Sequence, residues 1–542
     1  MNDKVRVRFA PSPTGKVHIG NIRTAIFNWL FARHEQGKFL VRVEDTDIER
    51  STSEAIEALF ECLKYLNIDF DEEVVYQTKM ADKHLEAAQS LADKGLAYYL
   101  PPKEAGEDTP VAFRIPFDCE NIAPVREVGP AEFAVHGEQQ VRIDLRGVTF
   151  SLVSKKGKAM PEQTMCLAGF KDLQLLDDKD EVIFTLKDDM VNDIYRGFIN
   201  HIFNGVVKMK FTRREVYFND VIKGELAKPL DSMKDLIIVR SDGTVVFHIA
   251  NVCDDNTQNI THIIRGDDHV ENTYRHIFLF AALGYNIPKY GHMPMIVNKS
   301  GKPYSKRDGD AFVGDFKSKG YNGEALFNYL ALLGWSPGDD REKMTRQEMI
   351  EAFTLERVKS STAQFDIMKL ENMNGLYLAE MPIDDVAATA IDFINQLAWG
   401  QNVVNDGYFV TVVKLMAQRL KVFTGVADWE YFFTDDFTVN EKVFKKQFKN
   451  SVVLEALTAV ASSIKLLDNS EFNAENIEKI LRDNEERFEL GKFKLNLPLR
   501  LAISGTNSGA DLIETALVLG EVKIVERIDK AVALADTLIS VE

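Results

Sequence analysis

The stretch that decides the fold of this chain lies near its N-terminus and runs Arg8-Phe9-Ala10-Pro11-Ser12-Pro13-Thr14-Gly15-Lys16-Val17-His18-Ile19-Gly20-Asn21. The alternating apolar run at 5–9 predicts a buried strand, and the prolines and Gly15 favour an open loop. A helical pattern follows at about 23–35. Because a loop between a strand and a helix start exposes backbone N–H groups and the positive end of the helix dipole, the stretch predicts a phosphate site.

The residues that follow predict a parallel sheet. A second strand pattern at 39–43 ends in Glu44-Asp45-Thr46-Asp47, and helical patterns follow at about 52–66 and 80–95. Alternation of strands and helices is typical of a parallel sheet with helices on its faces. The carboxyl ends of such strands carry the ligand site.

Arg8 and Glu44 both fall at a predicted strand end. A buried arginine needs an anionic partner. The sequence leaves two alternatives for Arg8, which are an acidic ligand and an internal ion pair with Glu44 or Asp47.

The pattern changes three times along the rest of the chain. Short alternating runs from about 113 to 216 predict a mostly β insertion with one helix near 189–204. The parallel-sheet pattern then resumes, with strands expected at 235–239, 245–251 and 261–268 and a helix at 271–284 that stops at Gly284. From about residue 320 onward nearly every segment is helical. The expected fold class is therefore α/β, a split parallel-sheet domain with a β-rich insertion and an all-helical C-terminal half.

Composition narrows the class of protein. A chain of 542 residues should hold roughly three or four domains of about 150 residues each, and 45% hydrophobic with 27% charged residues allows each to bury a core. The net charge of −18 lowers the prior for nonspecific nucleic-acid binding, although a local basic face can still bind phosphates. No run of 18 apolar residues occurs, and the four cysteines are scattered, which suits a reducing cytoplasm.

A second candidate for phosphate chemistry lies far along the chain. Ser305-Lys306-Arg307 belongs to a polar loop at 298–309, and such a loop can close on a polyphosphate and neutralise a pyrophosphate leaving group. Taken alone, the same residues are more typical of a solvated surface. In the N-terminal stretch His18 can donate a hydrogen bond to a phosphate oxygen, and Gly20 allows a ligand to approach the backbone closely.

Together these segments resemble the ordered signatures of class I glutamyl-tRNA synthetases of the bacterial type. His18-Ile19-Gly20-Asn21 resembles the HIGH motif of that family, and Tyr304-Ser305-Lys306-Arg307 resembles its KMSKS loop. Further similar segments are Val41 to Asp47, Ile264 to His269, Asn328 to Ser336, Lys369 to Tyr377, Met416 to Arg419 and Leu499 to Gly505. The resemblance extends along the chain except for the insertion.

The resemblance implies an activity and a set of site residues. The enzyme would activate L-glutamate with ATP and transfer it to the 3′ end of tRNA-Glu, by positioning and electrostatics without a protein nucleophile. The residues that match the family's catalytic positions are His18 and Lys306. The ATP-binding positions are His18, Gly20, Asn21, Asp268, Ser305, Lys306 and Arg307, and the glutamate-binding positions are Arg8, Ala10, Ser12, Glu44, Phe247, Asn251 and Arg265.

The resemblance also implies domains and partners. The expected domains are a Rossmann-type catalytic domain at 1–112 and 231–320, an inserted acceptor-stem-binding region at 113–230, a stem-contact helical domain at 321–380 and a helical anticodon-binding domain at 381–542. Mg²⁺ would accompany ATP. No zinc and no other bound metal is expected, because the Cys/His module that many relatives carry after Tyr98-Tyr99 is missing. The protein is expected to be a cytoplasmic monomer that does not bind a membrane.

Three departures from the family keep alternatives open. Phe247 replaces the usual Tyr, Pro303 replaces the first lysine of the KMSKS-like loop, and an extra segment at about 120–212 either enlarges the acceptor-binding region, docks a partner protein or has no function. Pro303 would stiffen a loop that has to move. The alternatives are a glutaminyl-type or nondiscriminating synthetase and a catalytically weak tRNA-binding paralogue.

Overall fold

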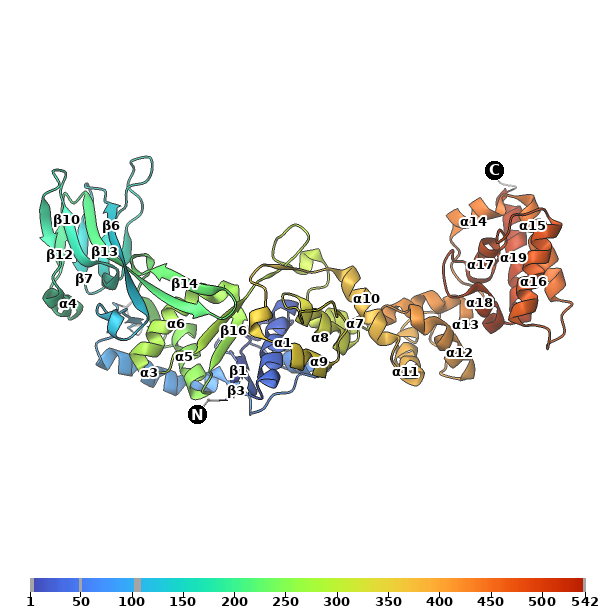
Figure 1. The fold of residues 1–542 in the computed structure, drawn as a ribbon, viewed down its shortest axis with the longest axis horizontal. Coiled ribbons are helices and arrows are strands. Elements are labelled where there is room, and N and C mark those ends of the chain that lie inside the picture. The colour runs from blue at the N-terminus through green and yellow to red at the C-terminus, as the bar shows by residue number, and fades with distance from the viewer. Residues whose placement is uncertain (1–3, 48–50, 102–108, 540–542) are drawn as a thin grey trace. The chain divides into compact units, whose positions relative to one another are not determined.

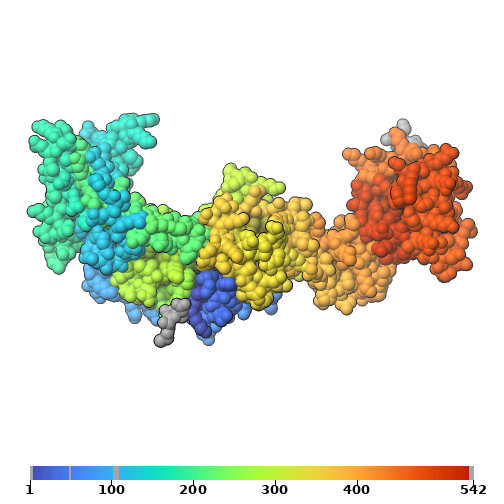
Figure 2. Space-filling model, in the orientation of Figure 1, coloured from blue at the N-terminus to red at the C-terminus, as the bar shows by residue number. Residues whose placement is uncertain are grey.

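The computed structural model describes residues 4–47, 51–101 and 109–539, with the side chains of 536–539 excepted. The chain forms two compact units, Met1–Gly314 with Phe327–Phe365, and Asp315–Leu326 with Asp366–Glu542. Figures 1 and 2 colour the chain by residue number. None of the described helices has the length and apolar character needed to cross a membrane.

The first unit holds all the described strands. They are β1 Arg6–Phe9, β2 Lys38–Val43, β3 Val75–Tyr76, β4 Ala97–Tyr99, β5 Val111–Phe113, β6 Val125–Ala134, β7 Val141–Asp144, β8 Gly147–Phe150, β9 Gln163–Met165, β10 Lys171–Leu176, β11 Val182–Thr185, β12 His201–Phe203, β13 Lys208–Asp220, β14 Gly224–Pro229, β15 Leu236–Val239, β16 His262–Gly266, β17 Lys289–Met293, β18 Ile296–Val297 and β19 Ala363–Gln364. Its helices are α1 Ile19–His34, α2 Ser53–Tyr65, α3 Ala81–Asp93, α4 Asp188–Tyr195, α5 Phe247–Thr257, α6 Val270–Leu283 and α9 Arg346–Ala352. Helices α7 Val313–Ser318 and α8 Gly323–Leu332 each continue from one unit into the other.

Parallel strands from two separate parts of the chain lie together beside α1. Strands β1, β2 and β3 pair in parallel, and so do β16 and β17. The backbone N–H of Thr261 donates to the carbonyl of Arg6 at 2.9 Å and brings the two parts together beside α1. In Figure 2 the blue N-terminal atoms adjoin the yellow region that contains α9, which packs on α1. The expected split α/β fold is confirmed, and Arg8 and Glu44 lie at the strand ends as predicted.

The insertion is β-rich and has its own core. The long strand β13 pairs with β6, β10 and β14, and β10 pairs in turn with β11. A second, antiparallel sheet has the strand order β12-β7-β8-β9. Between them pack the aromatic rings of Phe133, Phe150, Phe170 and Phe211. Strand β13 ends at Asp220, where it pairs with Tyr290 of β17. One strand therefore joins the insertion to the catalytic sheet, as Figure 1 shows.

Three elements differ from the sequence-based expectation. The helix expected near 189–204 is only α4 (Asp188–Tyr195), because Gly197 at φ 76 turns the chain into β12. The strand expected to resume the parallel sheet at 235–239 is β15, which pairs antiparallel with β5, the strand that leads into the insertion.

The third difference concerns the site directly. Residues 245–251 were expected to form a strand, but helix α5 begins at Phe247. A short apolar run does not distinguish a strand from a buried helix. Residues later in the sequence show why this segment is helical. Helix α5 continues through Asp254 and Asp255, and the helix buries both side chains on the side of β1 and β2.

The second unit is helical around a single large apolar core. Its helices are α10 Ile367–Leu378, α11 Ile383–Ile394, α12 Gly407–Met416, α13 Glu430–Phe433, α14 Glu441–Phe448, α15 Ser451–Ile464, α16 Ala474–Arg487, α17 Asn496–Ser504, α18 Leu512–Leu519 and α19 Glu521–Ile539. The core extends from Leu378 to Ala535 and includes Trp429. The all-helical C-terminal half is therefore confirmed.

Candidate active site

A cavity of about 730 Å³ opens at the carboxyl ends of the parallel strands. Its volume lies within the usual range for small-molecule sites, roughly 300–1,000 Å³. The expected site residues that line it are Arg8, Ala10, Ser12, His18, Gly20, Asn21, Glu44, Phe247, Asn251, Arg265 and Asp268. Ser305, Lys306 and Arg307 are not among its lining residues, although Pro303 and Tyr304 are.

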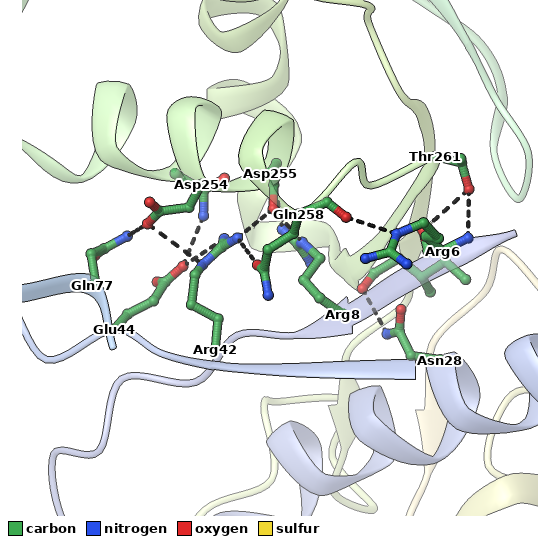
Figure 3. A network of polar contacts seen from close by, with 12 residues as sticks. Arg6, Arg8, Asn28, Arg42, Glu44, Gln77, Asp254, Asp255, Gln258 and Thr261 are labelled. Carbon is green, nitrogen blue, oxygen red and sulfur yellow. Dashed lines mark hydrogen bonds and ion pairs between the residues drawn. The ribbon is translucent and has the colours of Figure 1, made fainter. Parts of the chain in front are cut away.

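Arg8 belongs to a buried network of charges at the base of the cavity (Figure 3). Its Nε donates to Oδ1 of Asp255 at 2.9 Å, and Nη1 of Arg42 donates to the same oxygen at 2.6 Å. The internal ion pair considered for Arg8 therefore exists, but its partner is Asp255 of α5 rather than Glu44 or Asp47. Burial would raise the pKa of Asp255, but Arg42 and Arg8 hold it below its usual value.

Glu44 is a buried carboxylate that faces the cavity with spare acceptor capacity. Its Oε1 accepts from Nη2 of Arg42 at 3.2 Å and from Nδ2 of Asn251 at 2.8 Å. Burial raises the pKa of Glu44 above its usual value, although Arg42 and Arg8 oppose this. The buried Oδ1 of Asn251 has no hydrogen-bond partner in the part of the chain that the structure describes. An ammonium group beside Glu44 and Asn251 would satisfy these acceptors.

Arg265 differs from Arg8 because no acidic side chain of the described residues pairs with it. Its Nε donates to Nε2 of His292 at 3.3 Å, and its Nη2 donates to the hydroxyl of Thr273 at 2.7 Å. Burial lowers the pKa of Arg265 to about 10. A buried cation without a counter-ion is a site for an anion.

Phe247 lies on the same wall of the cavity at the start of α5. Its ring centroid is 6.2 Å from that of His269 and 5.9 Å from that of His276. Burial lowers the pKa of His276 well below its usual value, with Arg265 adding to the effect. This wall is therefore aromatic and neutral apart from Arg265.

His18 caps the first helix with one ring nitrogen, and its ring also interacts with the backbone of Tyr304. Its Nδ1 accepts a hydrogen bond from the backbone N–H of Gly20 at 3.0 Å, so the neutral ring carries its proton on Nε2. Burial lowers the pKa of His18. An Nε2–H donor at a helix N-terminus suits a phosphate oxygen.

The KMSKS-like loop is anchored next to His18, but its basic side chains stand apart from the cavity. The backbone N–H of Ile19 donates to the carbonyl of Ala311 at 2.9 Å, which fixes the end of the loop. Both the N–H and the hydroxyl of Ser305 donate to Asp308 at 2.9 Å. Lys306 and Arg307 are exposed and make no hydrogen bond or ion pair to the described residues. The residues of the KMSKS-like loop that would bind pyrophosphate are present in the sequence, but in this structure they do not line the cavity.

Sequence reasoning missed several residues that build the site. Arg42 and Asp255 are fully buried and fix Arg8, and Gln77 lines the cavity and donates to Asp254 at 2.8 Å. Arg23 also lines the cavity, and burial lowers its pKa to about 10. A signal was available for Arg42, because an arginine inside an apolar strand pattern requires a buried acid.

The region in which relatives carry a zinc module lies partly outside the described residues, at 102–108. Among those described, no group of three or more His, Cys, Asp or Glu side chains could hold a metal ion. The expectation that the protein has no zinc stays a prediction.

Comparison with known proteins agrees with this geometry. Residues 4–104 and 200–372 match the family described as tRNA synthetases class I (E and Q), catalytic domain, and residues 385–532 match an anticodon binding domain. Glutamate–tRNA ligase 2 of Thermoanaerobacter pseudethanolicus is 32% identical over 98% of both chains. The glutamate–tRNA ligase of Francisella tularensis subsp. novicida is 32% identical over 97% of this chain and 98% of its own.

Solved structures give the same result. A glutamate tRNA ligase from Elizabethkingia meningosepticum, crystallised in complex with its amino acid, is 25% identical with a TM-score of 0.69 and covers 98% of this chain and 99% of its own. The glutamate–tRNA synthetase from Elizabethkingia anophelis is 27% identical with a TM-score of 0.68, over 98% and 100% of the two chains. The alignments span nearly whole chains, whereas the family model of the catalytic domain leaves residues 105–199 unmatched. The chain belongs to the class I tRNA synthetases of the glutamate and glutamine type.

Proposed function

We propose that this protein is a glutamate–tRNA ligase whose active site is the cavity at the carboxyl ends of β1, β2 and β16. A carboxylate oxygen of glutamate attacks the α-phosphorus of ATP, and pyrophosphate leaves. A hydroxyl of the terminal ribose of tRNA then attacks the carbonyl of the mixed anhydride, and AMP leaves. The observation that carries the proposal is that one cavity joins a buried cation without an acidic partner, a buried acid and a capped helix N-terminus.

The charges of the cavity suit a glutamate molecule. Glu44 and the unpaired oxygen of Asn251 accept the α-ammonium, while Arg265 and the outer face of Arg8 hold carboxylates. Ala10, Ser12 and Phe247 complete the walls. An uncharged glutamine side chain would leave an arginine unpaired, which disfavours it.

The opposite end of the cavity suits ATP. His18 donates from Nε2 to the phosphates, and Gly20 and Asn21 lie in the first turn of α1. Asp268, which is exposed at the cavity edge, lies toward the ribose. Ser305, Lys306 and Arg307 close on the departing pyrophosphate, a motion that the exposed side chains of Lys306 and Arg307 allow.

Mg²⁺ arrives with the nucleotide. The metal supplies positive charge to the phosphates when it is bound, and it usually keeps several waters and needs few protein ligands in such sites. The absence of a three-residue acidic or histidine group among the described residues fits this mode of binding.

The helical unit is the partner site for tRNA. A cavity of about 790 Å³ within it is lined by Arg419, Tyr431 and the segment Ser504 to Gly509, among others. Burial and the nearby Arg419 lower the pKa of Arg500, so two arginines lie close together there. Trp429 is 1% exposed and belongs to the core, so Arg419 is the better candidate for contact with an anticodon base. The expected boundaries at 112, 230, 320 and 380, a monomeric state and a cytoplasmic location complete the proposal.

ATP–pyrophosphate exchange with glutamate or glutamine, each with and without total tRNA, tests the function. Glutamate-dependent exchange in the presence of tRNA is expected. Exchange with glutamine instead would identify the glutaminyl type, and exchange with neither would favour the weak tRNA-binding paralogue.

Paired substitutions test the residue roles. Lys306→Ala should lower kcat by about a hundredfold or more with little change in glutamate affinity, and Lys299→Ala in the same loop is its control. Arg8→Ala should weaken glutamate binding instead. Arg6→Ala is the control for Arg8, because Arg6 lies on the same strand but pairs with Glu72 outside the cavity. Wild-type behaviour of Arg8→Ala would place the amino-acid pocket elsewhere.

A further inference from the structure

Arg265 is held in the cavity wall by a buried chain of three side chains. Nδ1 of His292 lies 2.6 Å from Oδ2 of Asp220, and Nε2 of His292 lies 3.0 Å from the hydroxyl of Thr273 and 3.3 Å from Nε of Arg265. His292 and Thr273 are fully buried, and Asp220 is 3% exposed. These residues come from β13, β17 and α6, so three separate elements converge on one guanidinium.

The hydrogen bonds determine where the protons lie. Asp220 accepts from the backbone N–H groups of Ile222 and Lys223 at 2.9 Å and from the backbone N–H of His292. This carboxylate is therefore ionised, and hydrogen bonding from His292 lowers its pKa against the effect of burial. It accordingly accepts the proton of His292 Nδ1–H.

The opposite nitrogen of His292 must then be an acceptor. Nε2 carries a lone pair that accepts from Nε–H of Arg265 and from the hydroxyl of Thr273. A protonated ring would place an N–H donor and a positive charge against the guanidinium. Burial and Arg265 accordingly lower the pKa of His292.

These side chains hold the guanidinium of Arg265 through Nε and Nη2 and leave Nη1 for a ligand. Nε is bound by His292, and Nη2 is bound by Thr273 and the carbonyl of His269. Nη1 has no hydrogen-bond partner among the described residues, and Arg265 lines the cavity. Arg8 is different, because an acidic side chain, that of Asp255, already occupies its Nε and Nη2.

We propose that His292 and Thr273 are positioning residues that direct the free Nη1 of Arg265 at a substrate carboxylate. The inference rests on the proposed function for the identity of the substrate. Neither side chain lines the cavity, so His292 is not a general base despite its pairing with an aspartate. Its role is to hold the charge that binds glutamate in one orientation before the substrate arrives, which reduces the cost of binding.

Two pairs of variants test this proposal. Thr273→Val keeps the shape and removes the hydroxyl, whereas Thr273→Ser keeps the hydroxyl. His292→Asn keeps a donor for Asp220 and removes the acceptor for Arg265, whereas His292→Gln reaches farther with an amide oxygen. His262→Asn is the control, since His262 is a half-buried histidine of β16 that contacts Phe31 and does not line the cavity.

Equilibrium binding of L-glutamate to the full-length variants is measured, together with KM and kcat for tRNA-dependent pyrophosphate exchange. Thr273→Val and His292→Asn should weaken glutamate binding by about tenfold to a hundredfold, the usual effect of losing a hydrogen bond to a charged group. KM for ATP should not change, and Thr273→Ser, His292→Gln and His262→Asn should stay nearer to wild type. Thermal unfolding establishes which variants fold. If the His292 variants do not fold, the comparison of Thr273→Val with Thr273→Ser tests the positioning role by itself.

Two results would overturn the positioning role. One is a folded Thr273→Val that binds glutamate like wild type, and the other is an equal loss for glutamate and ATP. A wild-type protein that binds glutamate but shows no exchange would instead refute the proposed function, while the binding comparison would still test the role of Thr273 and His292.

Discussion

Phe247 differs from tyrosine only by the absent hydroxyl group, so it removes a hydrogen-bonding group from the cavity wall with little change in the shape of the wall. The ring lies on the cavity wall between His269 and His276, and it lacks the hydroxyl that the family usually places there. The nearby Arg265 supplies positive charge but no neutral donor. We therefore expect arginine to make the main contribution to glutamate binding in this chain.

Phe247→Tyr should lower KM for glutamate by about threefold to tenfold, because one neutral hydrogen bond to the substrate is typically worth about 0.5–1.5 kcal/mol. The change in kcat should be small, since the bond forms in the ground state and in the transition state alike. Pyrophosphate exchange at varied glutamate concentration measures both constants. Phe280→Tyr tests for a general effect of an added hydroxyl, because Phe280 is buried in α6 and does not line the cavity. An unchanged KM would show that the ring does not face the substrate.

Asp235 gives the molecule a pH-dependent stability that is separate from catalysis. Its Oδ2 accepts from the hydroxyl of Tyr98 at 3.1 Å, and the backbone of Ile115 also interacts with this carboxyl group. Burial raises the pKa of Asp235 to about 7, although Arg114 opposes this. In the unfolded chain the carboxyl ionises near pH 4, so its contribution to stability is complete below that pH and is lost as the pH rises through 7.

Asp235→Asn should therefore become progressively more stable than wild type between about pH 4 and pH 8, by up to about 4 kcal/mol at the upper end. Urea unfolding of both proteins at matched pH values measures the difference, in which the contributions of all other groups cancel. A difference that stays constant across this range would mean that Asp235 is ionised in the folded protein.

At the scale of the element, the first turn of α1 combines a structural and a chemical task in one side chain. His18 Nδ1 caps the helix, and a ligand phosphate would take the Nε2–H in place of the backbone of Tyr304, which interacts with the ring here. His18→Asn should separate the two tasks, because asparagine is a good N-cap but has no donor at the position of Nε2. The variant should unfold near the wild-type midpoint and lose about a hundredfold or more in kcat.

His18→Ala is the matched comparison for this prediction. It should lose the same activity and about 1 kcal/mol of stability in addition, which is the usual cost of a missing cap. Thermal unfolding and pyrophosphate exchange on both variants give the two quantities. Equal stability of the Asn and Ala variants would show that the cap contributes nothing measurable to α1.

The sequence predicted some kinds of secondary-structure element more accurately than others. The patterns predicted α2 and α3 closely because each helix has one apolar face, and they predicted β1, β2 and α6 as largely buried segments. Helix α5 was misread because its first residues are apolar on every side. Its identity depends on Asp254 and Asp255, whose partners Arg42 and Gln77 lie far away in sequence.

The sequence also did not predict which strands pair with each other. Strand β15 has the composition of an interior parallel strand, and only its position beside β5 makes it antiparallel. The candidate site residues within the motifs could be proposed by resemblance. Asp220 and His292 were not, because their role is defined by contact with Arg265 and not by any local pattern.

At the scale of the whole molecule, the chain consists of two units with separate cores. The apolar core of the helical unit extends from Leu378 to Ala535, and two apolar clusters of the first unit lie within residues 87–290 and 117–211. The candidate cavity for glutamate and ATP is lined by residues of the first unit alone. Substrates and temperature should therefore act on the units separately.

The tryptophans allow this to be measured directly. Trp29 and Trp335 lie in the first unit and Trp399 and Trp429 in the second, and these are all the tryptophans of the chain. A Trp399→Phe, Trp429→Phe double variant reports on the first unit, and a Trp29→Phe, Trp335→Phe double variant reports on the second. Saturating glutamate and ATP, near 100 times their dissociation constants, should stabilise the first unit by about 2.7 kcal/mol per ligand. The fluorescence midpoint of thermal unfolding should then rise by several degrees in the first variant and stay fixed in the second. A single transition that shifts equally in both variants would mean that the two cores unfold as one cooperative structure.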